Sequence, residues 1–493
     1  MKILILNHHF NQDISELLYY KNSLDEIKYI NPNYFANLAK SIFPSRVFGG
    51  GLSVYLDKEY DSCRNEYKNI AHKYLFELYK IYQFDIFISP SDTFFYIRDV
   101  IDACHFIHVP FIVIQKELGV SPYYFEKHAD QIRNTLPVKC DWMTTCSQDS
   151  KDFWVKAGAI ADNVLVVGQP RFDFYFRKQN KVQTIDSLIK KNEKINILFF
   201  SYDLDAYTEE MIDGKYSEPW KQLHDDTIDV LCEISKFDKY NIYIKPHPQY
   251  HGTYLNELTE KIESLPNVTI LPTAIDARLL ICQNDIIVGF QTTALFEAML
   301  LGKKIIYTFW TENVNNLKDR LLKFHEFEDC LSISKSKQTL KSYLINPLTI
   351  IGGDNITESI LNERINKFES ILGISDGNSS KRVFEILNYA YQFYKTTINE
   401  KQVLLRNKLR NKNELYQKKE YLISIMNLLK LNIIRILILI PGIGKKLKPY
   451  VSICIRNEKL RLNELSKINS VEIIGPTNFS VFFFFQGLVL KKL

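Results

Sequence analysis

The first candidate for chemistry is a short segment in which a basic side chain and a histidine follow an apolar run. Residues 242–248 are IYIKPHP, so the run ends at Lys245 and a proline stands on each side of His247. Proline fixes its own backbone and disfavours helix in the residue before it, so we expect His247 in a stiff, extended loop. A fixed cation beside an imidazole suits a diphosphate whose negative charge grows as it leaves. The same residues also fit a rigid turn with an exposed histidine.

A second candidate lies further along the chain, where an apolar run gives way to a glycine and a polar turn. Residues 284–307 are NDIIVGFQTTALFEAMLLGKKIIY. Gly289 permits close backbone approach, and Gln291, Thr292 and Thr293 precede a predicted helix. Free N–H groups at a helix start bind anions, and Glu297, one turn later, can accept a hydrogen bond from a ribose or sugar hydroxyl. The alternative is plain helix capping by either threonine, with Glu297 completing a capping box.

Three further sets of residues are candidates for a general base. Glu117 follows the apolar run 111–114 and precedes a glycine, and a partly buried carboxyl there is suited to accept the proton of an acceptor hydroxyl. Asp92 follows another apolar run, and His8 and His9 follow the first run of the chain. Each also fits an ordinary ion pair or an acceptor-binding role, and the sequence alone leaves this choice open.

These residues stand beside short apolar runs that alternate with longer amphipathic stretches. Runs that are apolar throughout are typical of strands covered on both faces in a parallel sheet flanked by helices. Strands are predicted at 2–6, 85–88, 111–114, 142–145 and 164–167, and again at 195–201, 241–245, 268–271, 286–288 and 304–308. Helices are predicted at 65–82, 93–108, 224–236, 254–265, 274–282 and 293–301.

Two such arrays joined by a polar connector predict an α/β chain with two Rossmann-like domains. The first domain is expected at 1–175, a lysine-rich linker at 176–194, the second domain at 195–395, and a basic and apolar tail at 396–493. In sheets of this kind ligands bind beyond the carboxyl ends of the strands. The candidate residues fall at these ends.

Several segments resemble GT-B enzymes of bacterial surface carbohydrate synthesis, which include capsule-type Kdo transferases and CDP-glycerol glycerophosphotransferase-like proteins. The resemblance is carried by KPHP at 245–248, by the helix start and GKK at 292–304, by VLVVGQPRFD at 164–173 and by DGNSSKRVFEIL at 376–387. Together these segments and the strands beside them span about residues 85–390.

The resemblance implies a GT-B fold, in which two parallel-sheet domains face a cleft, and metal-independent transfer from a donor held mainly by the C-terminal domain. The KPHP segment matches the family's basic segment, and Thr292, Thr293 and Glu297 match its helix start. Arg171 would sit at the interdomain cleft, within reach of a phosphate or a donor carboxylate. The turn 289–293, GFQTT, departs from the D-Y-S-S-like sequence usual in the glycerophosphotransferases, which favours a sugar donor.

Composition and motifs argue against several other classes. A net charge of +5 over 493 residues does not indicate nucleic-acid binding, and the eight cysteines form no CxxC pair or zinc-ligand cluster. No GxxxxGK[ST], GxSxG or HExxH motif occurs, and the triple glycine 49–51 lacks the context of a dinucleotide fingerprint. We expect no metal and no cofactor, and the resemblance implies a CMP- or UDP-linked nucleotide sugar as the substrate.

The ends of the chain bear on its location. The start, MKILILNHHF, is not a signal peptide, and no run of roughly twenty apolar residues predicts a transmembrane helix. Lys430 and Arg435 interrupt the apolar stretch 422–440, so residues 422–448 suit an amphipathic helix on the inner membrane surface, or a helix that packs on the protein or a partner. We expect a cytoplasmic protein, peripheral at the inner face of the plasma membrane.

The leading hypothesis is a glycosyltransferase that moves a sugar from a nucleotide sugar to a capsule or lipopolysaccharide acceptor, either a glycan or a glycolipid. Three alternatives stay open: a glycerophosphotransferase-like polymerase, a nucleotide-sugar 2-epimerase on the same fold, and a non-catalytic module of polysaccharide assembly that keeps the fold without the chemistry.

Overall fold

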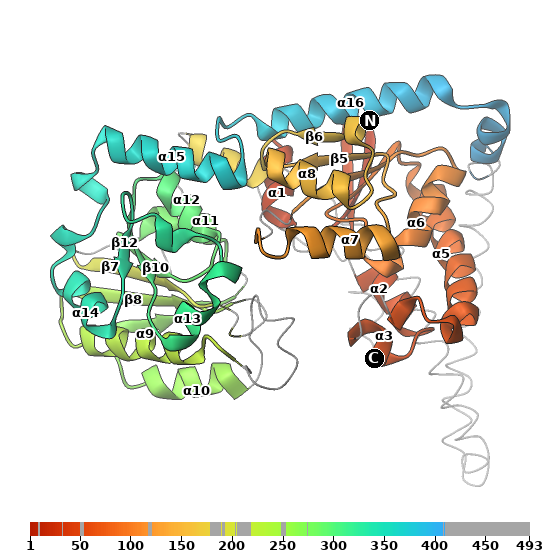
Figure 1. Ribbon diagram of the computed structural model, residues 1–493. Coiled ribbons are helices and arrows are strands. Elements are labelled where there is room, and N and C mark those ends of the chain that lie inside the picture. The colour runs from red at the N-terminus through yellow and green to blue at the C-terminus, as the bar shows by residue number, and fades with distance from the viewer. Residues whose placement is uncertain are drawn as a thin grey trace, which may run out of the picture.

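A computed structural model describes most of the chain up to Leu409 (Figure 1). The described residues are 1–7, 10–31, 33–49, 54–116, 121–177, 189, 193–202, 204, 218–247, 253–273, 275–407 and 409. Within them the chain forms two parallel sheets of six strands each, one in either half of the sequence. Figure 1 shows the two halves side by side, with helices around each sheet.

The first sheet has the strand order β2-β1-β3-β4-β5-β6, and all its pairings are parallel. Its strands are β1 (Lys2–Leu6), β2 (Glu26–Ile30), β3 (Ile86–Ser89), β4 (Phe111–Ile114), β5 (Trp142–Thr145) and β6 (Val164–Val166). The helices between them are α1 (Asn11–Leu17), α2 (Asn33–Lys40), α3 (Ser45–Gly49), α5 (Asp61–Tyr82), α6 (Phe95–Phe106), α7 (Phe125–Thr135) and α8 (Gln148–Lys156).

Strand β1 shows why its run is apolar throughout. Leu4 and Leu6 belong to a buried cluster with residues of α5 and α6, whereas Ile3 and Ile5 belong to another cluster with residues of α1. Successive side chains of a strand point to opposite faces, so both faces of this sheet are covered.

The second sheet has the strand order β12-β11-β10-β7-β8-β9, which is the 3-2-1-4-5-6 order of the Rossmann fold counted along the chain. Its strands are β7 (Ile195–Phe200), β8 (Tyr240–Lys245), β9 (Val268–Ile270), β10 (Ile286–Gly289), β11 (Lys304–Thr308) and β12 (Ser332–Ser334). The helices are α9 (Lys221–Ile234), α10 (Thr253–Ile262), α11 (Ala277–Gln283), α12 (Ala294–Leu300), α13 (Glu312–Leu317), α14 (Lys337–Ile345) and α15 (Glu358–Leu372).

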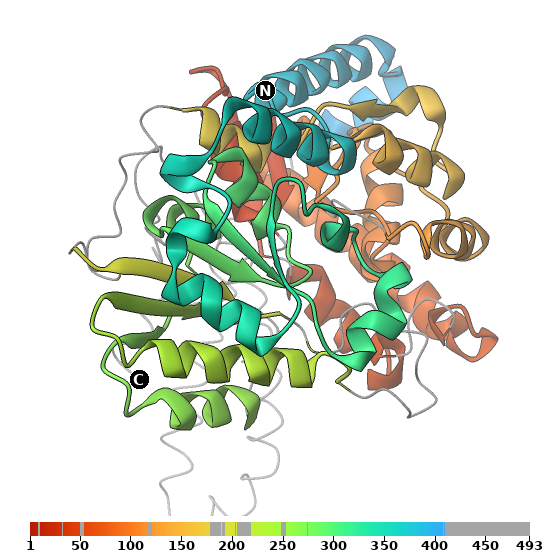
Figure 2. The same cartoon turned by 60° about the vertical axis from the view of Figure 1, so that its left-hand side comes forward.

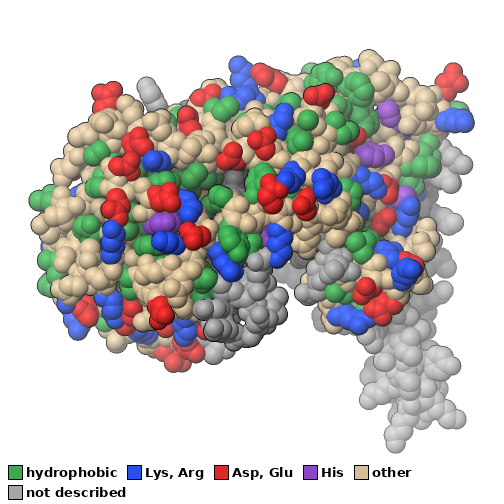
Figure 3. Space-filling model, in the orientation of Figure 1, with side chains coloured by type: hydrophobic (Ala, Val, Ile, Leu, Met, Phe, Trp, Pro, Cys, Tyr) green, Lys and Arg blue, Asp and Glu red, His purple; other side chains and the backbone are tan. Residues whose placement is uncertain are grey.

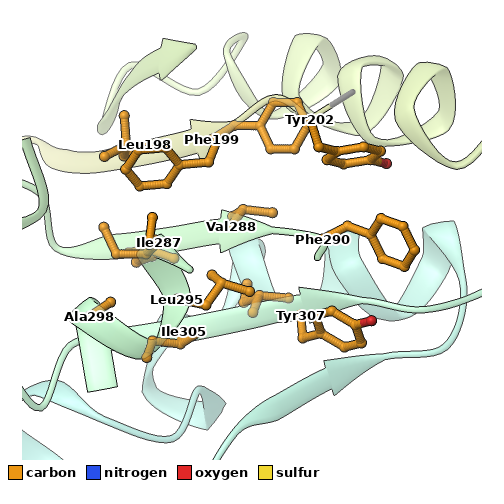
Figure 4. Close-up of a cluster of buried hydrophobic side chains, with 14 of the residues drawn as sticks. Leu198, Phe199, Tyr202, Ile287, Val288, Phe290, Leu295, Ala298, Ile305 and Tyr307 are labelled. Carbon is orange, nitrogen blue, oxygen red and sulfur yellow. The ribbon is translucent and has the colours of Figure 1, made fainter. Parts of the chain in front are cut away.

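The core of the second domain is built on the three central strands β7, β10 and β11. Figure 4 shows side chains of these strands packed with two from α12, namely Leu198, Phe199, Ile287, Val288, Ile305, Leu295 and Ala298. Where the strands end, Phe290 stacks on Tyr307 with ring centroids 5.7 Å apart. From β7 the sheet continues through β8 and β9 on one side, and from β10 through β11 and β12 on the other. The direction in which successive strands are added therefore reverses between β7 and β10, and ligands bind at this point in such sheets.

After the second sheet the chain returns to the first domain through a long helix, α16 (Ser379–Thr397). Figures 1 and 2 both show this helix lying over the first domain. Val383, Phe384 and Leu387 are buried in the cluster that also holds Ile3 and Ile5 of β1. Residues 195–395, predicted as one domain, thus include a helix that packs on the other one.

The start of α16 is fixed by an aspartate from the segment between the domains. Asp173 lies in a 3-10 helix, η3 (Pro170–Phe176), and its carboxylate accepts hydrogen bonds from the N–H groups of Ser379 (3.0 Å) and Ser380 (2.7 Å). Asp376 pairs with Arg382 through two bonds of 2.8 and 2.9 Å. The PRFD and DGNSS segments that carry the family resemblance therefore hold the domains together.

The predicted fold class, α/β with two Rossmann-like parallel-sheet domains as in GT-B enzymes, is confirmed by this topology. Two edge strands were not predicted, because β2 (EIKYI) alternates charged and apolar residues and β12 (SIS) is very short. None of the described helices is both long and apolar enough to span a bilayer. Residues 410–493, with the predicted amphipathic helix, and most of the linker 176–194 lie outside the described residues.

Candidate active site

The candidate residues of the second domain lie at the carboxyl ends of neighbouring strands. In the strand register, Phe200 at the end of β7 pairs with Lys245 on one side and with Gly289 on the other. Lys245 and Gly289 are therefore in one row, roughly 10 Å apart, because adjacent strands lie about 4.8 Å from each other. The structure brings the two predicted segments together at the switch point of the sheet.

Lys245 is nearly buried at this edge, and its ammonium group donates a hydrogen bond to the carbonyl of Thr273 (2.9 Å). Burial lowers the pKa of Lys245, and the neighbouring carboxylate of Asp276 acts in the opposite direction. His247 follows two residues later with a half-buried side chain, and Pro248 lies outside the described residues. The carboxyl end of β8 thus presents a cation that is held in place by the loop beside it.

Gln291 adopts a left-handed backbone conformation, with φ of 47°, at the end of β10. Its side-chain amide donates to the hydroxyl of Tyr307 (2.8 Å) and to the carbonyl of Leu322 (2.9 Å), and its oxygen accepts from the N–H of Leu322 (2.9 Å). These bonds tie the turn to a neighbouring loop. A side-chain carbon at Gly289 would lie 3.2 Å from Thr292 Cγ2, so glycine allows the turn to fold back closely.

The two threonines and Glu297 do not form the capping box that the sequence allowed. Thr292 Oγ1 accepts a long bond from the N–H of Ala294 (3.4 Å), and Thr293 makes no side-chain cap bond to the seven-residue helix α12. Glu297 is buried and accepts a hydrogen bond of 2.5 Å from the hydroxyl of Tyr175 in η3. Burial raises the pKa of Glu297, with Tyr175, Arg171 and Arg278 acting in the opposite direction.

Arg278 is the centre of a buried ionic network between the two domains. From α11 its guanidinium donates to Asp276 (2.7 Å) and reaches across to Glu16 of α1 (3.0 Å). It also lies over the ring of Phe174, 4.7 Å from the centroid. Gln12 of α1 completes the bridge by donating to Asp276 (2.8 Å). The first turns of two helices, one from each domain, are thereby joined.

Glu16 has an unusual electrostatic position in this network. It contacts Arg278 at 3.0 Å and Arg177 at 2.5 Å, and its side chain is only 2% exposed. Burial raises the pKa of Glu16 to about 7, and the two arginines offset only part of this effect. Burial acts to raise the pKa of Asp276. The charge of Arg278 and the hydrogen bonds from Arg278 and Gln12 outweigh burial and hold this pKa below its ordinary value.

Arg171 lies on the first-domain side of the same network. Its Nη2 donates to the carbonyl of Lys116 after β4 (2.6 Å), and its Nε lies 3.6 Å from the carboxylate of Asp13. Asp13 also accepts a bond from the backbone N–H of Arg171 (3.1 Å). Arg171 therefore connects the carboxyl end of β4 with α1 and with the interdomain segment.

Asp92 is placed differently from these residues. Its carboxylate is fully buried and accepts bonds from the N–H groups of Lys139 (2.7 Å) and Cys140 (3.0 Å) inside the first domain. Arg98 lies 3.5 Å away. In this structure the side chain of Asp92 anchors the segment before β5. Glu117, His8 and His9 lie outside the described residues.

The domains also touch at a second place, after the carboxyl ends of β4 and β11. Arg320 of the second domain lies over the ring of Tyr123, 5.0 Å from its centroid, and is 3.5 Å from the hydroxyl of Tyr124. The ends of the central strands thus lie between two interdomain contacts. Figure 3 shows the lobes meeting in the middle and separating below.

Five residues of this site were not foreseen: Gln12, Glu16, Tyr175, Asp276 and Arg278. Their signal in the sequence is weak, because each lies in or beside a short helix and finds its partner more than a hundred residues away. Asp276 was the easiest of the five to predict, because aspartate is a favoured N-cap residue. It is the N-cap of α11, and its side chain accepts a hydrogen bond from the N–H of Arg278. Within the described residues, no group of three or more His, Cys, Asp or Glu is placed to hold a metal ion.

Comparison with known proteins gives similarity to solved structures only, because no family model and no curated protein matches the chain. The complex of MnaA from S. aureus with UDP has 14% identity, with 81% of this chain and 98% of that chain covered and a TM-score of 0.47. UDP-GlcNAc 2-epimerase from Neisseria meningitidis, bound to UDP-GlcNAc, has 15% identity, coverages of 79% and 100%, and a TM-score of 0.44.

The wall teichoic acid polymerase TagF has 14% identity, with 62% of this chain and 73% of that chain covered and a TM-score of 0.41. At these identities and TM-scores the similarity concerns the fold alone. The fold described above rests on its own strand order and register.

Proposed function

We propose that the chain is a glycosyltransferase that uses a nucleotide sugar, UDP- or CMP-linked, and binds it between the two domains. The observation that carries this proposal is the row formed by Lys245 and Gly289 on either side of β7 at the switch point of a Rossmann sheet. Arg171 from the other domain belongs to the same interdomain network. A donor there would lie against the carboxyl ends of the central strands.

Lys245 is proposed to hold the diphosphate of the donor. An ammonium group has three N–H donors, and among the described residues one of them is used, by the carbonyl of Thr273. The carboxylates of Asp13, Glu16 and Asp276 balance the neighbouring arginines. The diphosphate would therefore be held by directed hydrogen bonds to Lys245 and His247 and not by a broad positive field.

The acceptor side is proposed to lie on the first domain. Because Asp92 is engaged in its own domain, Glu117 is the candidate base, with His8 as an acceptor-binding side chain. A general base takes the proton from the attacking hydroxyl while the nucleotide leaves. The acceptor would be a glycan or glycolipid of the cell surface.

Titration of the full chain with UDP-GlcNAc, UDP-glucose and CMP-Kdo by calorimetry tests the proposal. We expect Lys245→Met and His247→Ala to weaken the best donor about 10- to 100-fold, since a hydrogen bond to a charged group contributes about 1.5–3 kcal/mol. Lys303→Met is a matched control. Lys303 is half-buried, its ammonium group likewise donates to backbone carbonyls, of Cys282 (2.9 Å) and Asn284 (2.8 Å), and it lies at the opposite end of the sheet. Equal weakening in all three variants, or no saturable binding of any donor, would contradict the proposal.

A second candidate function is 2-epimerisation of the bound nucleotide sugar. The observation that favours it is the pair of buried carboxyl groups of Glu16 and Glu297. Burial raises the pKa of Glu297 and raises that of Glu16 to about 7, which suits Glu16 to proton transfer near neutral pH. Incubating the donor without acceptor and recording its NMR spectrum separates the two. Appearance of the epimer assigns the chain to this class, and an unchanged donor leaves transfer as the assignment.

A further inference from the structure

A cavity of about 790 Å³ lies on the first domain, away from the site proposed above. It is bounded by the first residue of β5, the outer edge of β6 and the exposed side of α16. Trp142 begins β5, so this cavity is near the amino end of that strand, whereas the proposed donor site lies at the carboxyl ends of the strands. The inference below goes beyond the proposed function and does not depend on it.

Three aromatic side chains line this cavity, and the ring of Trp142 is nearly perpendicular to the other two. The ring of Trp142 is 6.0 Å from that of Tyr389 at an interplanar angle of 88°, and 5.8 Å from that of Phe393 at 83°. Tyr389 and Phe393 are nearly parallel, at 25°, on successive turns of α16. Near-perpendicular rings at this spacing form edge-to-face pairs, and all three rings line the cavity.

The walls are partly exposed but fixed in place. Tyr389 is 61% exposed and Phe393 44%, whereas Trp142 is nearly buried. Tyr394, which also lines the cavity, donates a hydrogen bond of 2.5 Å to Asp141, and Asp141 accepts from the N–H of Phe111 (2.7 Å). A patch of hydrophobic side chains follows α16 at the upper right of Figure 3. Two large rings are thus left open to solvent on a rigid helix.

Three carboxylates and one guanidinium line the cavity. Asp162 and Glu385 line it, and neither forms an ion pair within the described part of the chain. Arg382 also lines it, but its guanidinium is paired with both oxygens of Asp376 and donates to the carbonyl of Val167 (2.8 Å). A ligand that complements this cavity is positively charged and apolar at its surface.

We propose that the cavity binds an organic ammonium group of the choline type. The faces of aromatic rings attract cations electrostatically, and perpendicular rings that surround quaternary ammonium groups are a recurrent solution to this recognition. The carboxylates of Asp162 and Glu385 supply the complementary charge. The group could be a free cation or a phosphocholine substituent carried on a glycan, and both present the same trimethylammonium head.

The test is titration of the full chain with choline chloride, followed by tryptophan fluorescence, because Trp142 lies in the cavity. We expect saturable binding, and binding of 3,3-dimethyl-1-butanol, the uncharged carbon isostere of choline, about tenfold or more weaker. A parallel titration with phosphocholine distinguishes a free cation from a phosphocholine substituent on a glycan. Tighter binding of choline favours a free cation, and tighter binding of phosphocholine favours the glycan substituent.

Variants localise the site. Tyr389→Leu with Phe393→Leu is expected to weaken choline about tenfold or more, and Glu385→Gln with Asp162→Asn severalfold, because these side chains are exposed and their loss does not disturb the core. Phe237→Leu is the control, since Phe237 is 46% exposed on the second domain. Circular dichroism confirms that each variant folds.

Three results would overturn the proposal. The first is equal binding of choline and its uncharged isostere, which would leave only an apolar pocket. The second is binding that the aromatic variants do not change, which would place the site elsewhere. The third is no saturable choline binding, including the case in which a neutral oligosaccharide such as maltohexaose binds instead.

Discussion

At the scale of single residues, Glu16 couples the fold to pH. Its pKa in the folded protein is about 7, above the ordinary value of 4.5, so the folded state holds the proton more tightly than the unfolded state. The resulting stabilisation is complete below pH 4.5 and is lost as pH rises through 7. At 1.36 kcal/mol per pKa unit the loss is about 3 kcal/mol. We predict that Glu16→Gln removes this part of the pH dependence.

The measurement is urea denaturation of both proteins between pH 5 and pH 8. The free energy of unfolding of the wild type minus that of Glu16→Gln should fall from pH 5 to about pH 7 and level off towards pH 8. Glu358→Gln, at the exposed start of α15, serves as the control and should leave the difference flat. A difference for Glu16→Gln that stays constant with pH would show that burial does not control this carboxyl group.

The residues of the site differ in how far the sequence could predict them. Lys245 and Gly289 could be predicted from the sequence, because each ends an apolar run and the ends of strands lie together in a parallel sheet. The partners of Gln291 and Glu297 were not, because Leu322 and Tyr175 come from distant loops. Side-chain bonds between remote segments depend on tertiary packing, which no local pattern records.

At the scale of elements, the start of α16 depends on one carboxylate. Asp173 accepts from two backbone N–H groups of the helix start, and it is buried. We predict that Asp173→Ala lowers the free energy of unfolding by about 2–3 kcal/mol, because two buried donors lose a charged acceptor. Chemical denaturation measures the change.

The matched control is Asp149→Ala, in the first turn of α8. Asp149 is exposed, and α8 is capped by the hydroxyl of Ser147, which accepts from Ser150 at 3.2 Å. Its removal should change stability by less than about 0.5 kcal/mol. Similar losses from the two substitutions would mean that Asp173 does not cap α16 to any useful extent.

Elements with uniform composition were predictable, and short or mixed ones were not. The strands of the sheet interiors were found because burial on two faces removes polar residues from them. The edge strand β2 and the seven-residue helix α1 were missed, since each carries charged residues whose partners lie elsewhere. In α1 these charged residues, Asp13 and Glu16, are the ones buried at the domain contact.

At the scale of the whole molecule, the contacts that join the domains differ in burial. Arg278 is buried with Glu16 and Asp276, whereas Arg320 touches Tyr123 and Tyr124 at a partly exposed position. We predict that Arg278→Met lowers the free energy of unfolding by about 3–5 kcal/mol, because Asp276 loses its charged partner and the buried Glu16 keeps only one of its two arginines. Arg320→Met should cost no more than about 1 kcal/mol.

Scanning calorimetry and small-angle X-ray scattering test this difference. For Arg278→Met we expect the domains to unfold in separate transitions and the radius of gyration to increase. For Arg320→Met we expect one transition, as in the wild type. If both variants unfold alike, the ionic network around Arg278 is not what couples the domains.

The number and type of the domains could be predicted from the sequence, because two arrays of alternating strands and helices flank a polar connector. The path of α16 could not, since its apolar residues show that one face is buried but not against which sheet. The contact between domains involves few residues. It therefore leaves almost no mark on composition or periodicity.

The return of α16 has a mechanical consequence. After the helix, Arg406 donates to the carbonyls of Ile107 and His108, and Leu409 is buried beside residues of α5. The first and last described residues, Met1 and Leu409, therefore both lie in the first lobe, and the second lobe comes between them in the sequence. A force applied between Met1 and Leu409 would act on the contacts of the first lobe before those of the second.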